Sequence, residues 1–477
     1  MIVTVRKSIP QGLINAPPSK SYTHRAVFAA SLGKNECRLF RCLLSADTRS
    51  TMEACRMFGA DIFETKTEGG DVVVLVRGFG GKPRLPNRPV DVGNSGTTLR
   101  FVTALSGLLD GEITLTGDAS IQKRPNTPLL ETLNKMGAKA YSIHGDGCAP
   151  LVVKGPVRLG AVSIDGGMSS QFISALLLSC PLLDGETILS IDGELKSKPY
   201  VDITLEIAEK AGIRITESQN ADSKNTDSKT GSKNADSKNA GSKNADSKNT
   251  ILEKKDAGFS YKISGNQTYN LSDYTIPGDF SSVSYALAAG ALIPGAEIAV
   301  GNIFPSAQGD SVMIEILKKM GADISWDTKS GVIHVSNKSG CRLKGIAVDA
   351  GKTPDLVPVL AVLGAFADGE MRITNAGHVR LKETDRLKAM AEELRKTGVA
   401  ISETEDGLII FGSKSKENIK GAALHGRDDH RVVMSLFIAG MMIGDVSIDT
   451  ADSVKISYPE FFEDMKRVGA DFSKEHL

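Results

Sequence analysis

Basic, hydroxyl and amide side chains recur beside short Gly- or Pro-containing turns at several places in this sequence. The first cluster, PPSKSYTHR, carries Lys20, Ser21 and Arg25. The later clusters, which include GNSGTTLR, SSQF, KETDR and DHR, contribute Asn94, Gly96, Arg124, Ser169, Ser170, Gln171, Ser197, Lys382, Arg386 and Arg431. Guanidinium and ammonium groups bind the oxygens of phosphates and carboxylates. Two acids, Asp355 and Glu383, lie among these cations.

Six of these clusters precede long apolar stretches that we expect to be helices. Each carries Gly, Ser, Thr or Asp where a helix N-cap belongs. The six segments are PPSKSYTHR, VGNSGTTLR, GGMSSQF, PGDFSSV, DAGKTPDL and GRDDHRV. Helix N-termini carry free N–H groups and partial positive charge, which favour bound anions. If the copies are arranged with pseudo-threefold symmetry, the helix starts of one domain can gather at one face.

A repeated glycine supports such symmetry. Charged helical patterns end in glycine and then a short apolar strand, at intervals of 78, 75, 109, 77 and 71 residues. The glycines are Gly59, Gly137, Gly212, Gly321, Gly398 and Gly469. The long interval contains a Ser/Lys/Asn/Asp tract from Ser218 to Thr250, and without it the spacing is regular. A fixed period indicates one structural unit copied in tandem.

A second glycine series runs in phase with the first and marks a second helix–strand junction. Its members are Gly33, Gly111, Gly185, Gly295, Gly369 and Gly444. Each unit is therefore expected to hold two helices, each followed by strand. The helix before the second series is apolar all round and should be buried, whereas the other is amphipathic and should lie outside.

Composition limits the remaining classes of function. The chain of 477 residues is too long for one core, so two domains of three units are expected. With 57 basic and 57 acidic residues, no global basic field favours nucleic acid or a membrane surface. The apolar runs are too short to span a bilayer, and the N-terminus does not read as a signal peptide. Six cysteines without C-x-x-C pairing favour reduced thiols in the cytoplasm and no metal site.

The tract from Ser218 to Thr250 is a five-residue low-complexity repeat. It lacks aromatic and branched apolar residues, so burial cannot offset the entropy of ordering it. We expect a disordered surface insertion, with a binding tail as the alternative.

Two other classes can be compared with these patterns. DAGKT at Asp349–Thr353 suggests a phosphate-loop kinase, but the glycine spacing misses that motif by one residue. A non-catalytic repeat scaffold explains the period but not the cationic clusters.

In their order, the motifs PSKSYTHR, GNSGTTLRF, SSQF, SKPY, GDFSS, KETDRL and DHR resemble the 3-phosphoshikimate 1-carboxyvinyltransferases, or 5-enolpyruvylshikimate-3-phosphate synthases. The resemblance covers the chain apart from the low-complexity tract. It implies transfer of the enolpyruvyl group of phosphoenolpyruvate to the 5-hydroxyl of shikimate 3-phosphate, with release of phosphate. That reaction belongs to the shikimate pathway of aromatic amino acid biosynthesis and needs no cofactor.

The resemblance also implies a two-domain α/β fold, an inside-out barrel of six units with the active site in the cleft. When the family's division into domains is applied to this chain, residues 21–269 form one domain, with the insert at 218–250. Residues 1–20 and 270–477 form the other. We expect a monomer.

Matched to the family motif, the candidate residues divide between two substrates and the proton transfers. Shikimate 3-phosphate is expected at Ser169, Ser170, Ser197 and Lys382, with its carboxylate near Ser21 and Arg25. Phosphoenolpyruvate is expected at Lys20, Arg124, Arg386 and Arg431, with Gln171 near both substrates and Asn94 and Gly96 allowing close approach. Asp355 matches the proton acceptor, and Glu383 is the candidate for the C3 proton, with Lys20 and Lys382 nearby.

Two positions depart from the family pattern, and one rival remains. His378 stands where the family often has asparagine, and Lys455 is displaced by one residue from the family's last lysine. The UDP-N-acetylglucosamine enolpyruvyl transferases share the repeat, but they carry a cysteine shortly before the arginine matched by Arg124. The corresponding segment here, GDASIQKR, has Ala119 and no cysteine.

Overall fold

The chain folds into repeated units, each a four-stranded sheet with two helices. In this computed structural model the described residues are 1–67, 70, 72–219, 258–412 and 419–475. Within them lie six four-stranded sheets, and in each a parallel pair is extended by two antiparallel strands. The six-unit α/β fold expected from the glycine period is confirmed.

The strands follow one spatial order in every unit. The parallel pair comes first in this order, and the two antiparallel strands follow. Three sheets are β14 (Tyr274–Thr275), β3 (Glu36–Phe40), β5 (Val72–Arg77) and β4 (Asp61–Lys66); β6 (Val90–Asp91), β7 (Glu112–Thr116), β9 (Leu151–Lys154) and β8 (Lys139–Ser142); and β10 (Gly160–Asp165), β11 (Thr187–Asp192), β13 (Phe259–Ile263) and β12 (Ile215–Gln219). The other three are β2 (Gln11–Asn15), β15 (Glu297–Gly301), β17 (Val332–Ser336) and β16 (Asp323–Asp327); β18 (Ala347–Asp349), β19 (Glu370–Thr374), β21 (Leu408–Phe411) and β20 (Ile401–Glu403); and β22 (Ala423–Leu424), β23 (Val446–Ile448), β1 (Ile2–Val5) and β24 (Phe472–Glu475).

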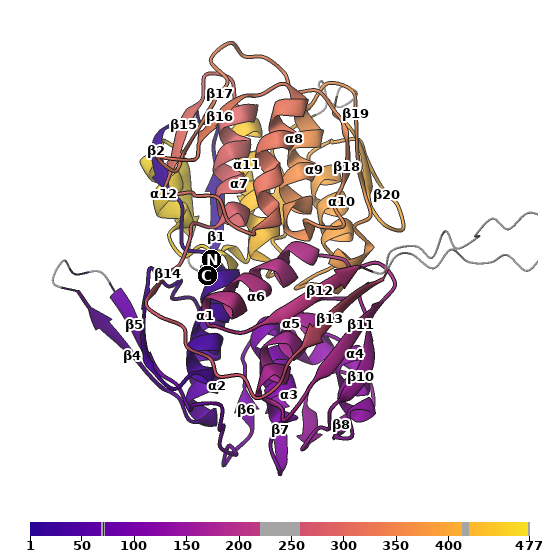
Figure 1. The fold of residues 1–477 in the computed structure, drawn as a ribbon. Coiled ribbons are helices and arrows are strands. Elements are labelled where there is room, and N and C mark those ends of the chain that lie inside the picture. The colour runs from indigo at the N-terminus through magenta and orange to yellow at the C-terminus, as the bar shows by residue number, and fades with distance from the viewer. Residues whose placement is uncertain (68–69, 71, 220–257, 413–418, 476–477) are drawn as a thin grey trace, which may run out of the picture.

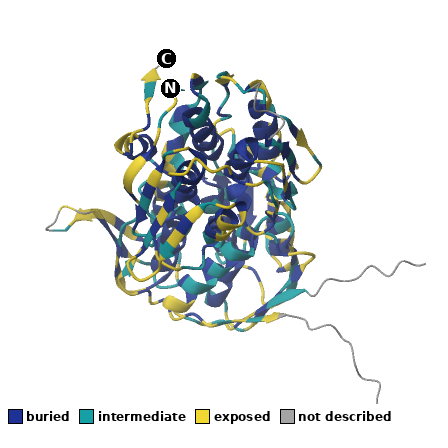
Figure 2. Ribbon diagram, turned by 90° about the horizontal axis from the view of Figure 1, so that it is seen from above, coloured by how far each residue is buried: buried dark blue, intermediate teal, exposed yellow. Residues whose placement is uncertain are grey.

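Each unit has an inner and an outer helix. The inner helices are α1 (Lys20–Leu32), α3 (Gly96–Ser106), α5 (Ser170–Ser179), α7 (Phe280–Leu292), α9 (Val357–Phe366) and α11 (His430–Ile443). The outer helices are α2 (Ala46–Phe58), α4 (Thr127–Lys135), α6 (Lys198–Lys210), α8 (Met313–Met320), α10 (Arg386–Lys396) and α12 (Phe461–Arg467). Every residue of α7 and α9 is buried, whereas α8 leaves Glu315 and its lysines exposed, as the two patterns predict. Figure 2 shows that buried helices fill the interior and that exposed segments lie mainly at the periphery.

The glycines of the first series all adopt left-handed backbone conformations. Their φ angles run from 81° at Gly212 to 115° at Gly59. Glycine reaches this conformation without a Cβ clash, which explains its return at each outer-helix end. The second series is less uniform. Gly33 is extended, with φ of −74°, and α3 ends at Ser106, so the helix end predicted at Gly111 is wrong.

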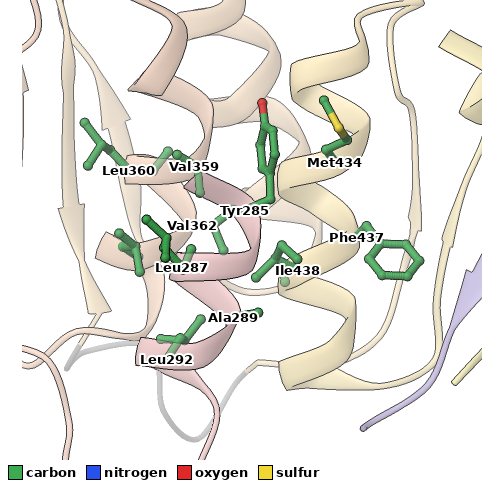
Figure 3. Close-up of a cluster of buried hydrophobic side chains, with 14 of the residues drawn as sticks. Tyr285, Leu287, Ala289, Leu292, Val359, Leu360, Val362, Met434, Phe437 and Ile438 are labelled. Atoms are coloured by element: carbon green, nitrogen blue, oxygen red, sulfur yellow. The ribbon is translucent and has the colours of Figure 1, made fainter. Parts of the chain in front are cut away.

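The buried apolar residues form two clusters, which define two lobes. The first lobe's core contains residues between Tyr22 and Ile276, and the second lobe's core contains residues 3–16 and 280–470. Figure 1 shows the lobes one above the other, with β1 and β2 beside the orange and yellow elements. In the second lobe, Leu287 of α7, Val362 of α9 and Ile438 of α11 contribute to the shared core (Figure 3).

The chain crosses between the lobes twice, at adjacent points. Pro18 and Gly278 form an isolated antiparallel bridge. Ser19 N–H donates to Pro277 C=O and Asp279 N–H donates to Pro17 C=O, both at 2.8 Å. Because Leu271 and Ile276 pack in the first core and β14 pairs with β3, we propose domain boundaries at these crossings rather than at residue 269.

The predicted insertion begins later than Ser218. Ser218 and Gln219 belong to β12, which pairs antiparallel with β13 and ends opposite Phe259. The rest of the predicted disordered insert, residues 220–250, lies outside the described residues.

Candidate active site

The starts of all six inner helices line one cavity between the lobes. Each helix contributes its first residue, its N-cap or the short turn before it. These residues are Lys20, Gly96, Ser170, Asp279, Asp355 and His430. The helix starts of each lobe therefore gather at one face, as expected, and the structure adds that both sets share one cavity.

Several of these helix starts are capped by side chains. The hydroxyls of Ser95 and Ser169 accept from N–H groups of α3 and α5. The Asp279 carboxylate caps α7 through Ser282 N–H and also accepts from Lys20 N–H at the start of α1, at 3.1 Å. One acid at the lobe crossing thus joins the starts of two inner helices, one from each lobe.

The first-lobe wall is basic, and its side chains are held by hydrogen bonds. Lys20 Nζ donates to Asp47 Oδ2 at 2.7 Å. Arg124 Nη2 donates to Asn94 Oδ1 at 2.7 Å and to Ser120 Oγ, while its Nε is buried without a partner. All three side-chain nitrogens of Arg25 donate hydrogen bonds within the protein, and Nε donates to Thr204 Oγ1 at 2.7 Å. Arg124 therefore retains more donor capacity for a ligand than Arg25.

In the second lobe, two arginines flank the Asp355 carboxylate. Arg386 Nη1 donates to Oδ1 at 2.7 Å, and Arg431 Nη2 donates to Oδ2 at 2.8 Å. Burial alone raises the pKa of Asp355, but Arg431 and Arg386 outweigh it and hold that pKa well below its usual value. Asp355, which precedes α9 in the turn η4 (Pro354–Leu356), is therefore ionised at neutral pH and able to accept a proton.

Arg386 and Arg431 differ in what they leave free. All three nitrogens of Arg386 are engaged, by Asp355, Glu383 and Asp429, and its side chain is 1% exposed. Arg431 Nη1, by contrast, is buried and has no partner. Unpaired buried donors are costly, so Arg431 is better prepared than Arg386 to receive an anion.

Two contacts join the walls across the cavity. The Tyr200 hydroxyl, on α6, donates to Asp355 Oδ2 at 2.5 Å. Arg124 Nη1 lies 3.7 Å from Glu383 Oε1. Burial raises the pKa of Glu383, but Arg386 and then Arg124 outweigh it and lower that pKa well below its usual value. Both candidate proton-transfer acids thus lie where the lobes meet.

The cavity brings together all but two of the sequence-predicted residues. Those that line it are Lys20, Ser21, Arg25, Gly96, Arg124, Ser169, Ser170, Gln171, Asp355, Lys382, Glu383, Arg386 and Arg431. Asn94 lies behind Arg124 and holds its guanidinium. Ser197 is buried, and its N–H donates to Gly351 C=O at 2.9 Å. The substrate-binding roles of all these residues remain predictions.

Further cavity residues were absent from the predicted set. Asp47, Thr97 and Asp279 line the cavity; Thr97 stands in the GNSGTTLR motif and Asp279 at an N-cap position, whereas Asp47 had no signal. Arg100, Tyr200 and His430 stand in the motifs but were not singled out as ligands, although all three line the cavity. His378 lines it too, with both ring nitrogens buried and unpartnered. Lys455 lies elsewhere, exposed and paired with Asp452.

The described residues contain no cluster of three or more His, Cys, Asp or Glu side chains placed to hold a metal ion. In the same part of the chain, no helix combines the length and apolar character needed to cross a membrane. All six cysteines are free, and none of them lines the cavity.

Comparison with known proteins agrees with this geometry. The family model described as EPSP synthase (3-phosphoshikimate 1-carboxyvinyltransferase) matches residues 6–237 and 249–465. A 3-phosphoshikimate 1-carboxyvinyltransferase from Methanosarcina acetivorans is 50% identical over 469 residues, covering 98% of both chains. Another from Methanococcoides burtonii is 50% identical over 471 residues, covering 99% of both.

Solved structures show the same fold. An EPSP synthase from Acinetobacter baumannii superimposes with a TM-score of 0.75 at 25% identity, covering 99% of this chain and 100% of that one. The motifs, the six-unit fold and the near-complete coverage agree, and this chain belongs to the EPSP synthase family, the 3-phosphoshikimate 1-carboxyvinyltransferases.

Proposed function

We propose that the cavity between the lobes transfers the enolpyruvyl group of phosphoenolpyruvate to the 5-hydroxyl of shikimate 3-phosphate. The C–O bond to the 5-oxygen forms, the bond from the pyruvyl carbon to the phosphate oxygen breaks, and phosphate leaves. The relatives are named 3-phosphoshikimate 1-carboxyvinyltransferases, and we assign the reaction to the shikimate pathway of aromatic amino acid biosynthesis.

The charge of the cavity suits these substrates. Each brings one phosphate and one carboxylate, so the pair carries roughly six negative charges. Lys20, Arg25 and Arg124 line the first-lobe wall, and Lys382, Arg386 and Arg431 line the second. A net-neutral chain can concentrate positive potential in a cleft in this way.

Each substrate is assigned to part of the lining. Shikimate 3-phosphate lies against Ser169, Ser170 and Lys382, with its carboxylate toward Ser21 and Arg25 and with Ser197 supporting its site. Phosphoenolpyruvate lies against Lys20, Arg124 and Arg431, and Gln171 contacts both substrates. Because Arg386 has its three nitrogens engaged, it acts mainly by positioning Asp355 and Glu383.

Asp355 accepts the proton of the 5-hydroxyl. Its carboxylate is ionised because two arginines flank it, and the Tyr200 hydroxyl fixes its orientation from the other lobe. Glu383 exchanges the proton at C3 of phosphoenolpyruvate, because a phosphate dianion bound nearby raises its pKa and favours protonation.

The observation that carries this proposal is the Asp355 carboxylate, which lies between two arginines and opposite the cationic wall of the first lobe. The test is phosphate release, measured with each substrate alone and with both together. Turnover that needs both is expected, and Asp355→Asn should lower kcat by about 10²- to 10⁴-fold.

The matched control is Asp327→Asn, an exposed turn acid bonded to Ser330, which should keep full turnover. Turnover with UDP-N-acetylglucosamine in place of shikimate 3-phosphate would instead support the rival transferase. Full turnover by Asp355→Asn would contradict the role of Asp355 as base.

We further propose that the protein acts as a monomer, as the family resemblance implies. The monomer expected from the family resemblance is tested by sedimentation at working concentration. The free cysteines support the expected cytoplasmic location, where thiols stay reduced, and cell fractionation tests it.

A further inference from the structure

A second, smaller cavity adjoins the first on the side of α6 and α7. It is lined by Ser21, Tyr200, Asp279, Ser281, Gln308 and Asp310, together with Pro199, Ile203 and Gly309. Three of these residues, Ser21, Tyr200 and Asp279, also line the main cavity. The small cavity therefore shares a wall with the proposed reaction centre.

The small cavity contains two acids, Asp279, which caps α7, and Asp310, which caps no helix and has no part in the proposed mechanism. Asp310 lies in the short helix η3 (Gly309–Val312), just before α8, and is 3% exposed. Its Oδ2 accepts a hydrogen bond from Ser281 Oγ in the first turn of α7. No ammonium or guanidinium group of the described residues pairs with it directly.

Charged and titratable groups from both lobes act on Asp310. Asp279 at the start of α7 and Tyr200 on α6 line the same small cavity, and Asp355 in η4 and Arg431 on α11 interact with Asp310 electrostatically. The charged residues of α8 that follow, Glu315 and Lys318, pair with each other at the surface and do not enter this set. Asp310 thus interacts electrostatically with the same arginine that flanks Asp355, and with Asp355 itself.

We propose that Asp310 is a positioning residue for the reaction, whose negative charge raises the basicity of Asp355 and so promotes removal of the 5-hydroxyl proton. Two arginines make Asp355 a weak base, and a second carboxylate that interacts electrostatically with Arg431 offsets part of that effect. The interaction between two carboxylates is mutual, so each raises the pKa of the other. This inference rests on the proposed role of Asp355 as the base.

The proposal predicts a pH dependence with a definite sign. Burial, and then the charge of Asp355, raise the pKa of Asp310 to about 7, against the opposing effects of Arg431 and Ser281. Below that pH Asp310 is neutral and leaves Asp355 weakly basic. Above it Asp310 is charged and Asp355 becomes the stronger base.

The decisive variant is Asp310→Asn, which keeps the size of the side chain and an acceptor for Ser281 but cannot ionise. Its kcat should fall about three- to tenfold below that of the unmodified chain at pH 8.5 and match it within about twofold at pH 6. The matched control is Asp323→Asn, because the Asp323 carboxylate also accepts from a serine hydroxyl, that of Ser336, but on the surface. Its kcat ratio to the unmodified chain should stay near one at both pH values.

A second variant keeps the test informative if Asp310→Asn folds poorly. Ser281→Ala removes the hydrogen bond that favours the charged carboxylate, so the pH at which kcat changes should move upward. A kcat ratio for Asp310→Asn that is the same at every pH, or no upward movement in Ser281→Ala, would overturn the proposal. If Asp355→Asn retains full turnover, the assignment of the base fails instead, which is a separate outcome.

Discussion

Arg386 and Arg431 have identical side chains but differ in how many of their nitrogens are hydrogen-bonded within the protein. Both were expected to bind phosphoenolpyruvate, yet Arg386 is saturated by three carboxylates while Arg431 keeps a buried nitrogen unpartnered. The spacing of KETDR and DHR identifies both arginines as part of one site. Their difference depends on Asp429, Glu383 and Asp355, which come together only after folding. The sequence alone could therefore predict which cationic residues belong to the site, but not which of them keeps an unpaired N–H donor.

His378 provides a residue-scale test of ligand binding. Burial, followed by Lys382 and Lys196, lowers its pKa to about 4, so the ring is neutral above that pH and offers one donor and one acceptor. An asparagine amide offers the same pair. His378→Asn should therefore keep the KM for shikimate 3-phosphate within about threefold, whereas His378→Ala should raise it about five- to tenfold through one lost hydrogen bond.

The control for His378 is His334→Ala, an exposed histidine in β17 that should leave both KM values unchanged. Steady-state kinetics with each substrate varied in turn measures the effect. Equal KM values for the alanine and asparagine variants would show that the ring makes no polar contact with the substrate.

Among the elements, outer-helix ends were predictable because left-handed glycine leaves a sequence mark. All six glycines of the first series have positive φ, so the pattern and its physical cause agree. The second series was only partly reliable, since Gly33 directly follows α1 as predicted but Gly107 rather than Gly111 follows α3. A glycine after an apolar run also marks a strand or turn, and sequence cannot separate those uses.

Gly321 offers a test of whether the left-handed backbone conformation is what selects glycine at the outer-helix ends. It caps α8 with φ of 95°, and a Cβ added there meets no atom within 4 Å. Gly321→Ala should therefore cost only the backbone strain, about 1 kcal/mol of unfolding free energy. Lys319→Ala, two residues earlier on the exposed face of α8, should change the unfolding free energy by less than about 0.5 kcal/mol.

Urea unfolding of both variants measures this difference. Gly290→Ala in the interior of α7 should cost more, about 1–3 kcal/mol, because its Cβ would lie 2.5 Å from Val335 Cγ1. An unchanged unfolding midpoint for Gly321→Ala would mean that the left-handed conformation is not what selects glycine there.

The β12–β13 hairpin allows the insertion to be removed without disturbing the site. Gln219 pairs with Phe259, so deleting residues 221–257 joins Asn220 to Gly258 and leaves a two-residue Asn-Gly turn, the favoured sequence for this hairpin. Glu217, which pairs with Lys198 beside Ser197, is retained. Turnover should stay within about twofold, and the shorter loop should stabilise the chain by about 2 kcal/mol.

Phosphate release and thermal unfolding measure the two effects of this deletion. A version in which Gly-Gly replaces the Asn-Gly turn separates turn preference from loop length. A loss of turnover above about tenfold would give the low-complexity segment a catalytic function and restore the binding-tail alternative.

For the whole molecule, the repeat was sufficient to predict two groups of three units but not how the chain shares them. The N-terminal strand β1 lies between β23 and β24, and β2 completes the sheet of β15. These pairings join residues more than 280 positions apart, and no local pattern encodes them. The position of the crossings at Pro18 and Gly278 therefore required the structure, although the family resemblance had implied that the chain leaves one domain and returns.

Closure of the two lobes around both substrates is the prediction at this scale. The first lobe contributes Lys20 and Arg124 and the second contributes Lys382 and Arg431, so like charges face each other across the cavity. Several polar contacts already join the walls, among them Tyr200 to Asp355, Ser197 N–H to Gly351 C=O and Lys196 to Asn375. Anions bound between the walls replace repulsion by attraction, which favours the compact arrangement.

Small-angle scattering should therefore show a smaller radius of gyration when shikimate 3-phosphate and an unreactive phosphoenolpyruvate analogue are added together. Calorimetry should show that each ligand tightens the other by about fivefold or more, since both draw on one closed state. Lys382→Ala removes a cation from the second-lobe wall and should weaken both effects, whereas Lys319→Ala, far from the cavity lining, should preserve them. If the radius stays constant while both ligands are bound, the lobes are rigid, and the division of the cations between them serves binding alone.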